Sequence, residues 1–229
     1  ISACLVGSEM CIRDRSKTAY VMDLSGPVGD CAVAAPTLIT FSAEVVGKAA
    51  HAGFAPEDGV HAIQVAAAAV ANLPSGRWGD VTVNVGTITG GRATNIVPDS
   101  CTVTGEIRAL CHQDALDRLN EIHSEFVEQA QAVDAKLNFN HTIHITGYRV
   151  DTDAPVAQRF RRACEAVGVA PRFTDTYGGS DCNILSAHGI QGLVVATAMN
   201  NCHAVNEYTT VEELCKAGRL AQALMEKQD

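Results

Sequence analysis

The order of strand-like and helix-like segments between residues 37 and 145 limits the folds open to this chain more than any other feature. The pattern predicts a strand at 37–47, a helix at 58–73, strands at 80–89 and 101–110, a helix at about 113–133 and a strand at 136–145. In the first strand, Ile39, Phe41 and Val45 recur at every second or fourth position, as in a strand with one buried face. The order β-α-β-β-α-β is that of a ferredoxin-like sandwich, in which the helices pack on one face of an antiparallel sheet.

The chain after residue 147 has a different rhythm, typical of an α/β protein. The pattern predicts a helix at 153–168, a short strand at 171–177, a glycine turn at 178–181 that opens a short helix ending at 187–189, a strand at 191–199 and a helix at about 211–226. The strand 191–199 is almost wholly apolar, as expected for a strand covered on both faces. We therefore expect a ferredoxin-like unit at 37–147 inserted into an α/β domain formed by 16–36 and 148–229.

Composition excludes several classes of protein. With 229 residues, 47% of them hydrophobic, the chain can bury a core without disulfide staples. The net charge of -9 argues against a nucleic-acid partner or an anionic membrane surface. The nine cysteines are odd in number and contain no C-x-x-C pair, which argues against a disulfide framework and a cysteine-rich zinc knuckle. The sequence shows neither a membrane-length apolar run nor a signal peptide, so we expect a cytoplasmic protein with reduced thiols.

The first 15 residues do not resemble natural protein sequence. The chain begins with Ile1, and "CLVGSEMCIRDR" resembles translated sequencing-adapter sequence. We therefore exclude 1–15 from fold reasoning as a segment that is not native. On this reading, the natural protein extends further upstream.

Two polar turns follow strands of the α/β part. "YGGSD" follows the strand at 171–177, and "NNCH" follows the strand at 191–199. Ligands of open α/β sheets bind beyond the carboxyl ends of the strands, so the two turns could meet at one site. From the residues alone, His203 is either a functional side chain or a histidine hydrogen-bonded at a loop edge.

Four segments in order carry a family resemblance: "GKAAHAGFAPEDGVHAI", "GTITGGRATNIVPDSCTVTGEIRA", "YGGSDCNILSAHGI" and "NNCHAVNEYTTVEEL". They resemble the dinuclear zinc exopeptidase family of peptidase T, aminoacylase, glutamate carboxypeptidase and succinyl-diaminopimelate desuccinylase. "YVMDLSGPVGD" is similar to the peptidase T-like, tripeptide aminopeptidase branch. The resemblance covers the chain from about Lys17 onward. It implies a partial zinc-peptidase catalytic domain with an inserted dimerisation lid, and a homodimeric hydrolase of short peptides.

The resemblance also implies metal ligands. Asp23 and His203 match residues that ligate the two zinc ions, although Asp23 could instead be a turn residue before a Gly-Pro step. The "HQD" at 112–114 and the glutamate pair at 212–213 imitate family motifs, but both lie in the first turns of predicted helices. The remaining ligands and the general-base glutamate match no segment here and would precede Lys17. This chain is therefore expected to bind zinc weakly and to be inactive.

Lid residues matching the family's substrate contacts are His51, Asn95 and Arg108. The resemblance implies that His51 reaches the partner subunit's site and donates to the substrate carbonyl, where it would stabilise an oxyanion; an exposed loop histidine is the alternative. Asn95 resembles a substrate contact but also suits a turn. Arg108 could hold a substrate carboxylate, or could pair with Glu106 or Asp99.

In the glycine turn, Gly178, Gly179 and Ser180 would line the substrate pocket with backbone donors, whereas Asp181 could cap the following helix. His141 and His144 are three apart on a strand, so they point to opposite faces and cannot chelate together. Cys202 beside His203 suggests a thiol nucleophile, but adjacent strand residues point apart. Two other functions stay open: a non-catalytic dimerisation module, and another amide hydrolase of aminoacylase or carboxypeptidase type.

Overall fold

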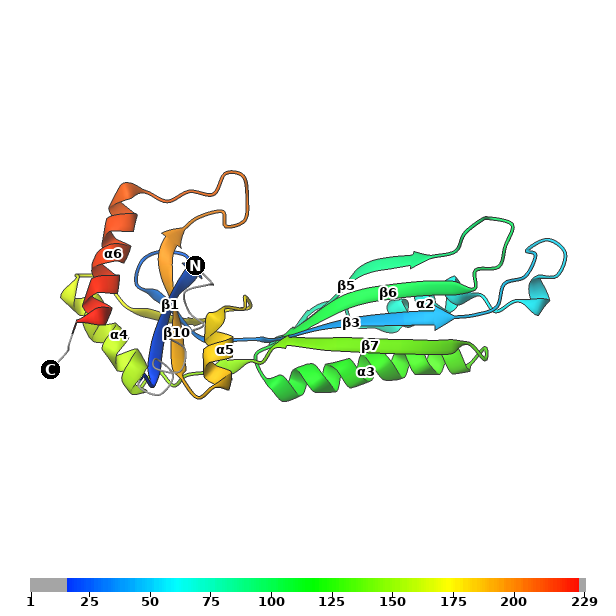
Figure 1. Ribbon diagram of the computed structural model, residues 1–229, viewed down its shortest axis with the longest axis horizontal. Coiled ribbons are helices and arrows are strands. Elements are labelled where there is room, and N and C mark those ends of the chain that lie inside the picture. The colour runs from blue at the N-terminus through cyan, green and yellow to red at the C-terminus, as the bar shows by residue number, and fades with distance from the viewer. Residues whose placement is uncertain (1–15, 227–229) are drawn as a thin grey trace, which may run out of the picture. The chain divides into compact units, whose positions relative to one another are not determined.

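The computed structural model describes residues 16–226, which belong to two compact units (Figure 1). The ferredoxin-like unit spans Thr37–Ile145, and the α/β unit comprises the chain up to Pro36 and from Thr146 onward. Each unit has its own hydrophobic cluster of buried residues. The predicted adapter-like segment, 1–15, lies outside the described residues.

The ferredoxin-like unit has the predicted element order. Its elements are β3 (Thr37–Val46), the short helix η2 (Pro56–Asp58), α2 (Ala62–Asn72), β4 (Gly76–Trp78), β5 (Val81–Gly90), β6 (Ser100–Ala109), α3 (His112–Gln131) and β7 (Lys136–Ile145). The strands form one antiparallel sheet in the order β4-β5-β6-β3-β7. This is the strand order of a ferredoxin-like sandwich, preceded by one extra short edge strand, and the predicted fold class is confirmed.

One face of this sheet forms the core of the unit. Burial along β3 alternates without a break: Ile39, Phe41, Ala43 and Val45 are buried, and each residue between two of them is partly exposed. Helices α2 and α3 cover the buried face, where Phe126 of α3 is fully enclosed. Gly105 is required here, because a Cβ at this position would lie 2.5 Å from the Phe41 ring. The opposite face carries mainly polar side chains.

The α/β unit is built on a mixed sheet. Its elements are β1 (Thr18–Ser25), β2 (Asp30–Ala35), β8 (Tyr148–Arg149), α4 (Pro155–Ala166), β9 (Arg172–Asp175), α5 (Asp181–Ala187), β10 (Gln191–Met199) and α6 (Val211–Met225). The sheet order is β1-β10-β2-β8, and β9 also pairs with β2. The β1/β10 and β2/β9 pairs are parallel, and the other pairs are antiparallel. The α/β pattern of this part is typical of a largely parallel sheet, and the antiparallel β2/β10 pairing departs from that expectation.

Helices cover both faces of this sheet, with α4 and α6 on one side and α5 on the other (Figure 1). Five consecutive residues of β10, 192–196, are buried, as expected for an inner strand. The Tyr20 hydroxyl donates to the carbonyl of Val156 at 2.7 Å, which ties β1 to α4. Arg159 of α4 donates to the carbonyl of Leu224 at 2.6 Å, so it satisfies an unpaired carbonyl near the end of α6.

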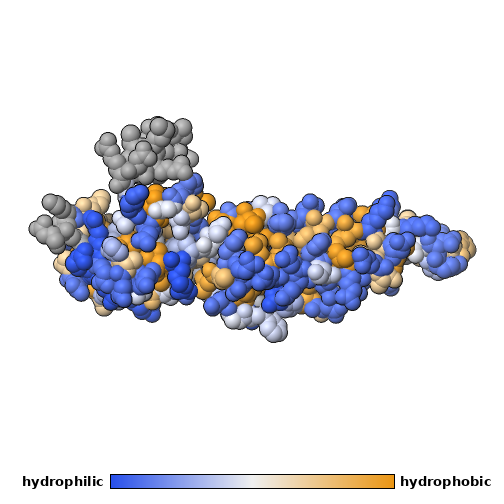
Figure 2. All heavy atoms as spheres, turned by 90° about the horizontal axis from the view of Figure 1, so that it is seen from below, coloured by the Kyte–Doolittle hydropathy of each residue, from blue (hydrophilic) through white to orange (hydrophobic). Residues whose placement is uncertain are grey.

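The face of the molecule drawn in Figure 2 is mostly hydrophilic, with smaller hydrophobic patches between the polar side chains. Within residues 16–226, none of the helices combines the length and the apolar character needed to cross a bilayer.

Candidate functional site

The two predicted metal ligands lie at or beyond the ends of neighbouring strands of the α/β unit. Strands β1 and β10 run parallel and pair from Thr18 with Gln191 to Ser25 with Met199, so their carboxyl ends meet at one edge of the sheet. Asp23 lies near the end of β1, His203 lies in the loop after β10, and both are exposed. The edge beyond the carboxyl ends of parallel strands is where α/β proteins place ligands.

The loop that carries His203 has a fixed and unusual backbone. Asn200 and Tyr208 close it with a pair of backbone hydrogen bonds of 3.0 and 3.1 Å. Inside the loop, the His203 N–H donates to a carboxylate oxygen of Glu207 at 2.9 Å. His203 itself has a φ of 67°, in the left-handed region that costs a non-glycine residue free energy. Backbone conformations of this strained kind occur preferentially at functional sites.

Strain extends back into the strand. Ala198 and Asn201 also have positive φ, at 60° and 53°. The β1/β10 register is shifted at this point, where Leu24 pairs with Ala196 but Ser25 pairs with Met199. The sequence analysis missed Glu207 and this distortion. The one local signal for Glu207 was its position four residues after His203.

Ser180, rather than Asp181, caps α5. The Ser180 hydroxyl accepts the N–H of Cys182 at 3.3 Å, and its own N–H donates to the side chain of Asn183 at 3.0 Å. This reciprocal arrangement is a capping box. Asp181 instead lies in the first helical turn, where its charge suits the helix dipole.

Capping leaves few backbone donors in the glycine turn. The N–H of Gly178 donates to the Thr176 hydroxyl at 3.1 Å, and the N–H of Ser180 is used by the capping box. Gly179 keeps an N–H without an intramolecular acceptor among the described residues. The role of the turn in substrate binding stays a prediction, and this geometry favours Gly179 as the donor.

The described residues do not form a complete metal site. No group of three or more His, Cys, Asp or Glu side chains is placed to hold a metal ion within 16–226. Catalytic zinc sites use three protein ligands, and a pair of ions needs more. Asp23 and His203 are chemically suitable ligands, but they do not suffice for the predicted pair of zinc ions.

The motif-like histidines of the ferredoxin-like unit have local partners. His112, at the start of α3, shares a hydrogen bond of 3.1 Å with the Thr37 hydroxyl. His144 shares one of 2.8 Å with the Thr40 hydroxyl on the open face of the sheet. Both histidines therefore have hydrogen-bond partners within the ferredoxin-like unit.

His51 and Asn95 lie on adjacent loops of the ferredoxin-like unit. His51 forms an antiparallel bridge with Ile96, and the Ala52 N–H donates to the Asn95 carbonyl at 3.0 Å. The Val97 N–H donates to the carbonyl of the residue before His51 at 2.9 Å. Both predicted substrate contacts are exposed, and the backbone between them is held by hydrogen bonds.

Arg108 pairs with Glu106 on β6. Its Nε donates to Glu106 at 2.9 Å, and its Nη2 donates to the same carboxylate at 3.3 Å. Asp99, the other partner considered, is bound by Arg92. Of the two ion-pair partners considered for Arg108, the structure shows Glu106. A role of Arg108 in binding substrate stays a prediction.

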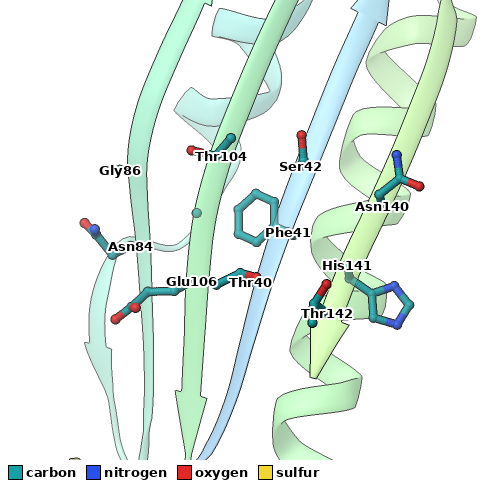
Figure 3. Close-up of a pocket in the computed structure, with 11 residues that line it drawn as sticks. Thr40, Phe41, Ser42, Asn84, Gly86, Thr104, Glu106, Asn140, His141 and Thr142 are labelled. Atoms are coloured by element: carbon teal, nitrogen blue, oxygen red, sulfur yellow. The ribbon is translucent and has the colours of Figure 1, made fainter. Parts of the chain in front are cut away.

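A shallow hollow lies on the open face of this sheet (Figure 3). Its volume is about 430 Å³, and hydroxyl and amide side chains dominate its lining: Thr40, Ser42, Asn84, Thr104, Asn140 and Thr142. Glu106, the carboxylate in the lining, is already paired with Arg108. None of the predicted site residues lines the hollow.

Buried thiols of the α/β unit are poor nucleophiles. Burial raises the pKa of Cys164 and of Cys182 from 9.0 to about 11, and it raises the pKa of Cys31 further. All three are fully buried and hold their protons at neutral pH. This argues against a cysteine hydrolase centred on these residues.

Comparison with known proteins decides the nature of the ferredoxin-like unit. Residues 33–134 match the model of the M20 peptidase dimerisation domain. Most of the ferredoxin-like unit is therefore similar to a peptidase dimerisation domain, and the unit is called the dimerisation domain below. The first two of the four sequence segments that carry the resemblance lie within this match.

Similarity extends over both units. The chain is 31% identical to the uncharacterized protein YqjE of Bacillus subtilis over 91% of its own length and 56% of that protein. It matches the crystal structure of aminopeptidase PepT from Bacillus cereus with a TM-score of 0.88 and 35% identity, covering 96% of this chain and 60% of that one. It matches a tripeptidase from Staphylococcus aureus with a TM-score of 0.90 and 26% identity, covering 97% and 59%. The chain therefore spans less than two thirds of the length of these relatives.

Proposed function

We propose that this chain is part of a metal-dependent exopeptidase that hydrolyses the N-terminal peptide bond of short peptides. The observation that supports the proposal is the parallel pairing of β1 with β10, because the strand that carries Asp23 and the strand that precedes His203 end side by side. Similarity to an aminopeptidase and to a tripeptidase, over nearly the whole chain, supports the choice of substrate.

Zinc is the proposed metal. A pair of zinc ions supplies a metal-activated water and polarises the substrate carbonyl. In this chain, Asp23 and His203 would each hold one of the ions, and the other ligands and a general base would come from outside the described residues. His51 would donate its N–H to the carbonyl oxygen as negative charge develops there.

The test compares two forms of the protein. The 229-residue chain is expected to bind zinc with a dissociation constant of about 100 µM or weaker, because two ligands provide only part of the affinity of a complete site. A form that includes the additional length present in the relatives is expected to release the N-terminal residue of tripeptides, and to lose this activity with a chelator. Zinc competition titrations and amino-acid release are the measurements.

Substitution of His203 tests the ligand assignment in the longer form. His203→Ala is expected to lower kcat/KM by at least a factor of about 1,000, since a zinc ligand is lost. His188→Ala is the matched control, because His188 is also exposed but its ring contacts the carbonyl of Ile184. Full activity of His203→Ala would reject the ligand assignment. A folded, dimeric longer form that hydrolyses no peptide would favour the non-catalytic module instead.

We also propose that the protein forms a homodimer through the β5 and α2 side of the dimerisation domain. Strand β4 pairs with 81–83 of β5, and the outer edge of 84–90 has no strand beside it among the described residues. Ile88 on this edge is 50% exposed. The nearby helix α2 exposes Ala67, Ala68 and Ala71, small side chains that allow a second helix to approach closely.

The opposite edge is less suited to pairing. Strand β7 carries Lys136 among its exposed residues, and a lysine on an edge strand discourages strand addition. Ala68→Glu is expected to weaken the dimer at least tenfold in sedimentation equilibrium, whereas Ser124→Glu on the exposed face of α3 should leave it unchanged. The reverse result would move the interface to the β7 side.

A further inference from the structure

The imidazole of His51 is held on two sides by residues of its own loop. Its Nδ1 accepts the N–H of Gly53 at 3.2 Å. Its ring stacks on the ring of Phe54, with centroids 4.3 Å apart and planes inclined by 30°. The Phe54 N–H donates to the His51 carbonyl at 3.2 Å, so the two residues are also joined through the backbone.

These contacts define which nitrogen carries the proton. Because Nδ1 of His51 accepts a hydrogen bond, the neutral ring carries its proton on Nε2. Among the residues that the structure describes, no acceptor takes this Nε2–H. The ring therefore presents one free N–H donor at its outer edge, which is the group that a developing oxyanion needs.

Phe54 has no other role in the fold. Its side chain is 86% exposed, and it belongs to neither hydrophobic cluster. A single exposed apolar side chain is common and proves nothing by itself. What distinguishes Phe54 is that its ring covers a face of the imidazole. The rotation of a histidine ring about Cβ–Cγ has broad minima, so a neighbouring ring can decide its orientation.

We propose that Phe54 is a positioning residue for His51. Its ring limits the rotation of the imidazole, so that Nδ1 stays on the Gly53 N–H and Nε2–H stays directed outward. The inference rests on the proposed function for the use made of that donor. The stack and the tautomer themselves are properties of this loop, and they can be measured without any activity.

The test is spectroscopic and uses the 229-residue chain. Long-range proton–nitrogen spectra of the His51 ring are recorded at about pH 8.5, above the usual range of histidine titration. Phe54→Ala removes the stack, Phe54→Tyr preserves it, and Trp78→Ala removes an exposed aromatic ring from β4 of the same domain as the matched control. The amide signals of Ala52 and Val97, whose N–H groups tie the two loops together, report the backbone.

In Phe54→Ala, the fraction of His51 with its proton on Nδ1 is expected to rise about two- to tenfold, the range that the free energy of an aromatic stack implies. Phe54→Tyr and Trp78→Ala should match the unsubstituted chain, and the Ala52 and Val97 amides should not move. An unchanged tautomer ratio in Phe54→Ala would overturn the proposal. So would displaced amides, because Phe54 would then act on the loop. Failure of the peptidase assays would leave this spectrum unaffected, so the two hypotheses fail separately.

Discussion

In the dimerisation domain, α2 and α3 turn their large apolar side chains toward one sheet, and neither helix has a large hydrophobic residue that is exposed. In the α/β unit, α6 buries Leu220 and Leu224 but exposes a second apolar stripe. Val211, Leu214 and Met225 of that stripe are 80%, 58% and 78% exposed. The helices α2 and α3 of the dimerisation domain therefore bury their large apolar side chains more completely than α6 of the α/β unit does.

Both units leave strand edges open within residues 16–226, at 84–90 of β5 and at β7 in the dimerisation domain, and at β1 in the α/β unit. The long inner strands β3 and β6 of the dimerisation domain have neighbours on both sides. In the α/β unit, the eight-residue strand β1 pairs with β10, and its other edge has no partner within residues 16–226. An open strand edge and an exposed apolar stripe are both features of surfaces that bind further protein. We expect the α/β unit to be the less stable of the two.

The largest effect is expected from matched truncations in the two cores. Phe126 of α3 and Phe160 of α4 are both fully buried. Replacing either with Ala should destabilise its own unit by about 3–5 kcal/mol, through lost burial and the cavity left behind. Phe126→Ala should shift the urea transition of the dimerisation domain, and Phe160→Ala that of the α/β unit.

The sequence supplies a separate probe for each unit. The single tryptophan, Trp78, lies in the dimerisation domain, and all four tyrosines lie in the α/β unit. Tryptophan fluorescence and tyrosine absorbance therefore follow the two transitions separately. If both variants shift both signals equally, the units unfold as one and the comparison fails.

The second-largest effect is expected at alkaline pH, which should lower the free energy of unfolding of the α/β unit more than that of the dimerisation domain. Burial raises the pKa of Cys31, Cys164 and Cys182 in the α/β unit, and it raises the pKa of Cys101 in the dimerisation domain. Above about pH 9 an unfolded thiol has lost its proton, while a buried one keeps it, so stability falls as the pH rises toward 11. The loss at pH 10 is about 1.4 kcal/mol for each thiol, or about 4 kcal/mol for the three thiols of the α/β unit.

Urea titrations at about pH 8 and 10 measure this loss. Cys164→Ala should reduce the pH dependence of the α/β unit by about a third, because one of three thiols is removed. Equal alkaline losses in the tyrosine and tryptophan signals would contradict the assignment of the effect to these buried thiols.

The smallest effect concerns the exposed stripe of α6. A Cβ added at Gly218 would meet no atom within 4 Å. Gly218→Ala should therefore stabilise the α/β unit by about 0.5–1 kcal/mol, through the higher helix propensity of alanine. Thermal unfolding followed by tyrosine absorbance is the measurement.

Gly192→Ala is the contrasting variant, since its Cβ would lie 2.7 Å from the sulfur of buried Cys182. It should destabilise the same unit. If Gly218→Ala lowered stability instead, the added methyl group would have to meet an atom in solution. The exposed stripe of α6 would then be covered by another surface.

The success of the sequence analysis differed between the units for a physical reason. Alternation along 37–47 predicted the buried face of β3, because one side of that strand faces helices and the other does not. The strands β1 and β2 were missed. All six residues of β2 are buried, so its sequence shows no alternation that would distinguish it from a short apolar loop.

By itself, the sequence determined the order of the elements of the dimerisation domain, the family resemblance and the identity of the candidate residues. These depend on local periodicity and on short motifs, which can be read along the chain. Only the tertiary structure decided that β1, which carries Asp23, pairs in parallel with β10, which precedes His203, because 180 residues separate the two side chains in the sequence. It also decided that Ser180 caps α5 and that Phe54 covers His51, since those contacts depend on side-chain directions that spacing does not specify.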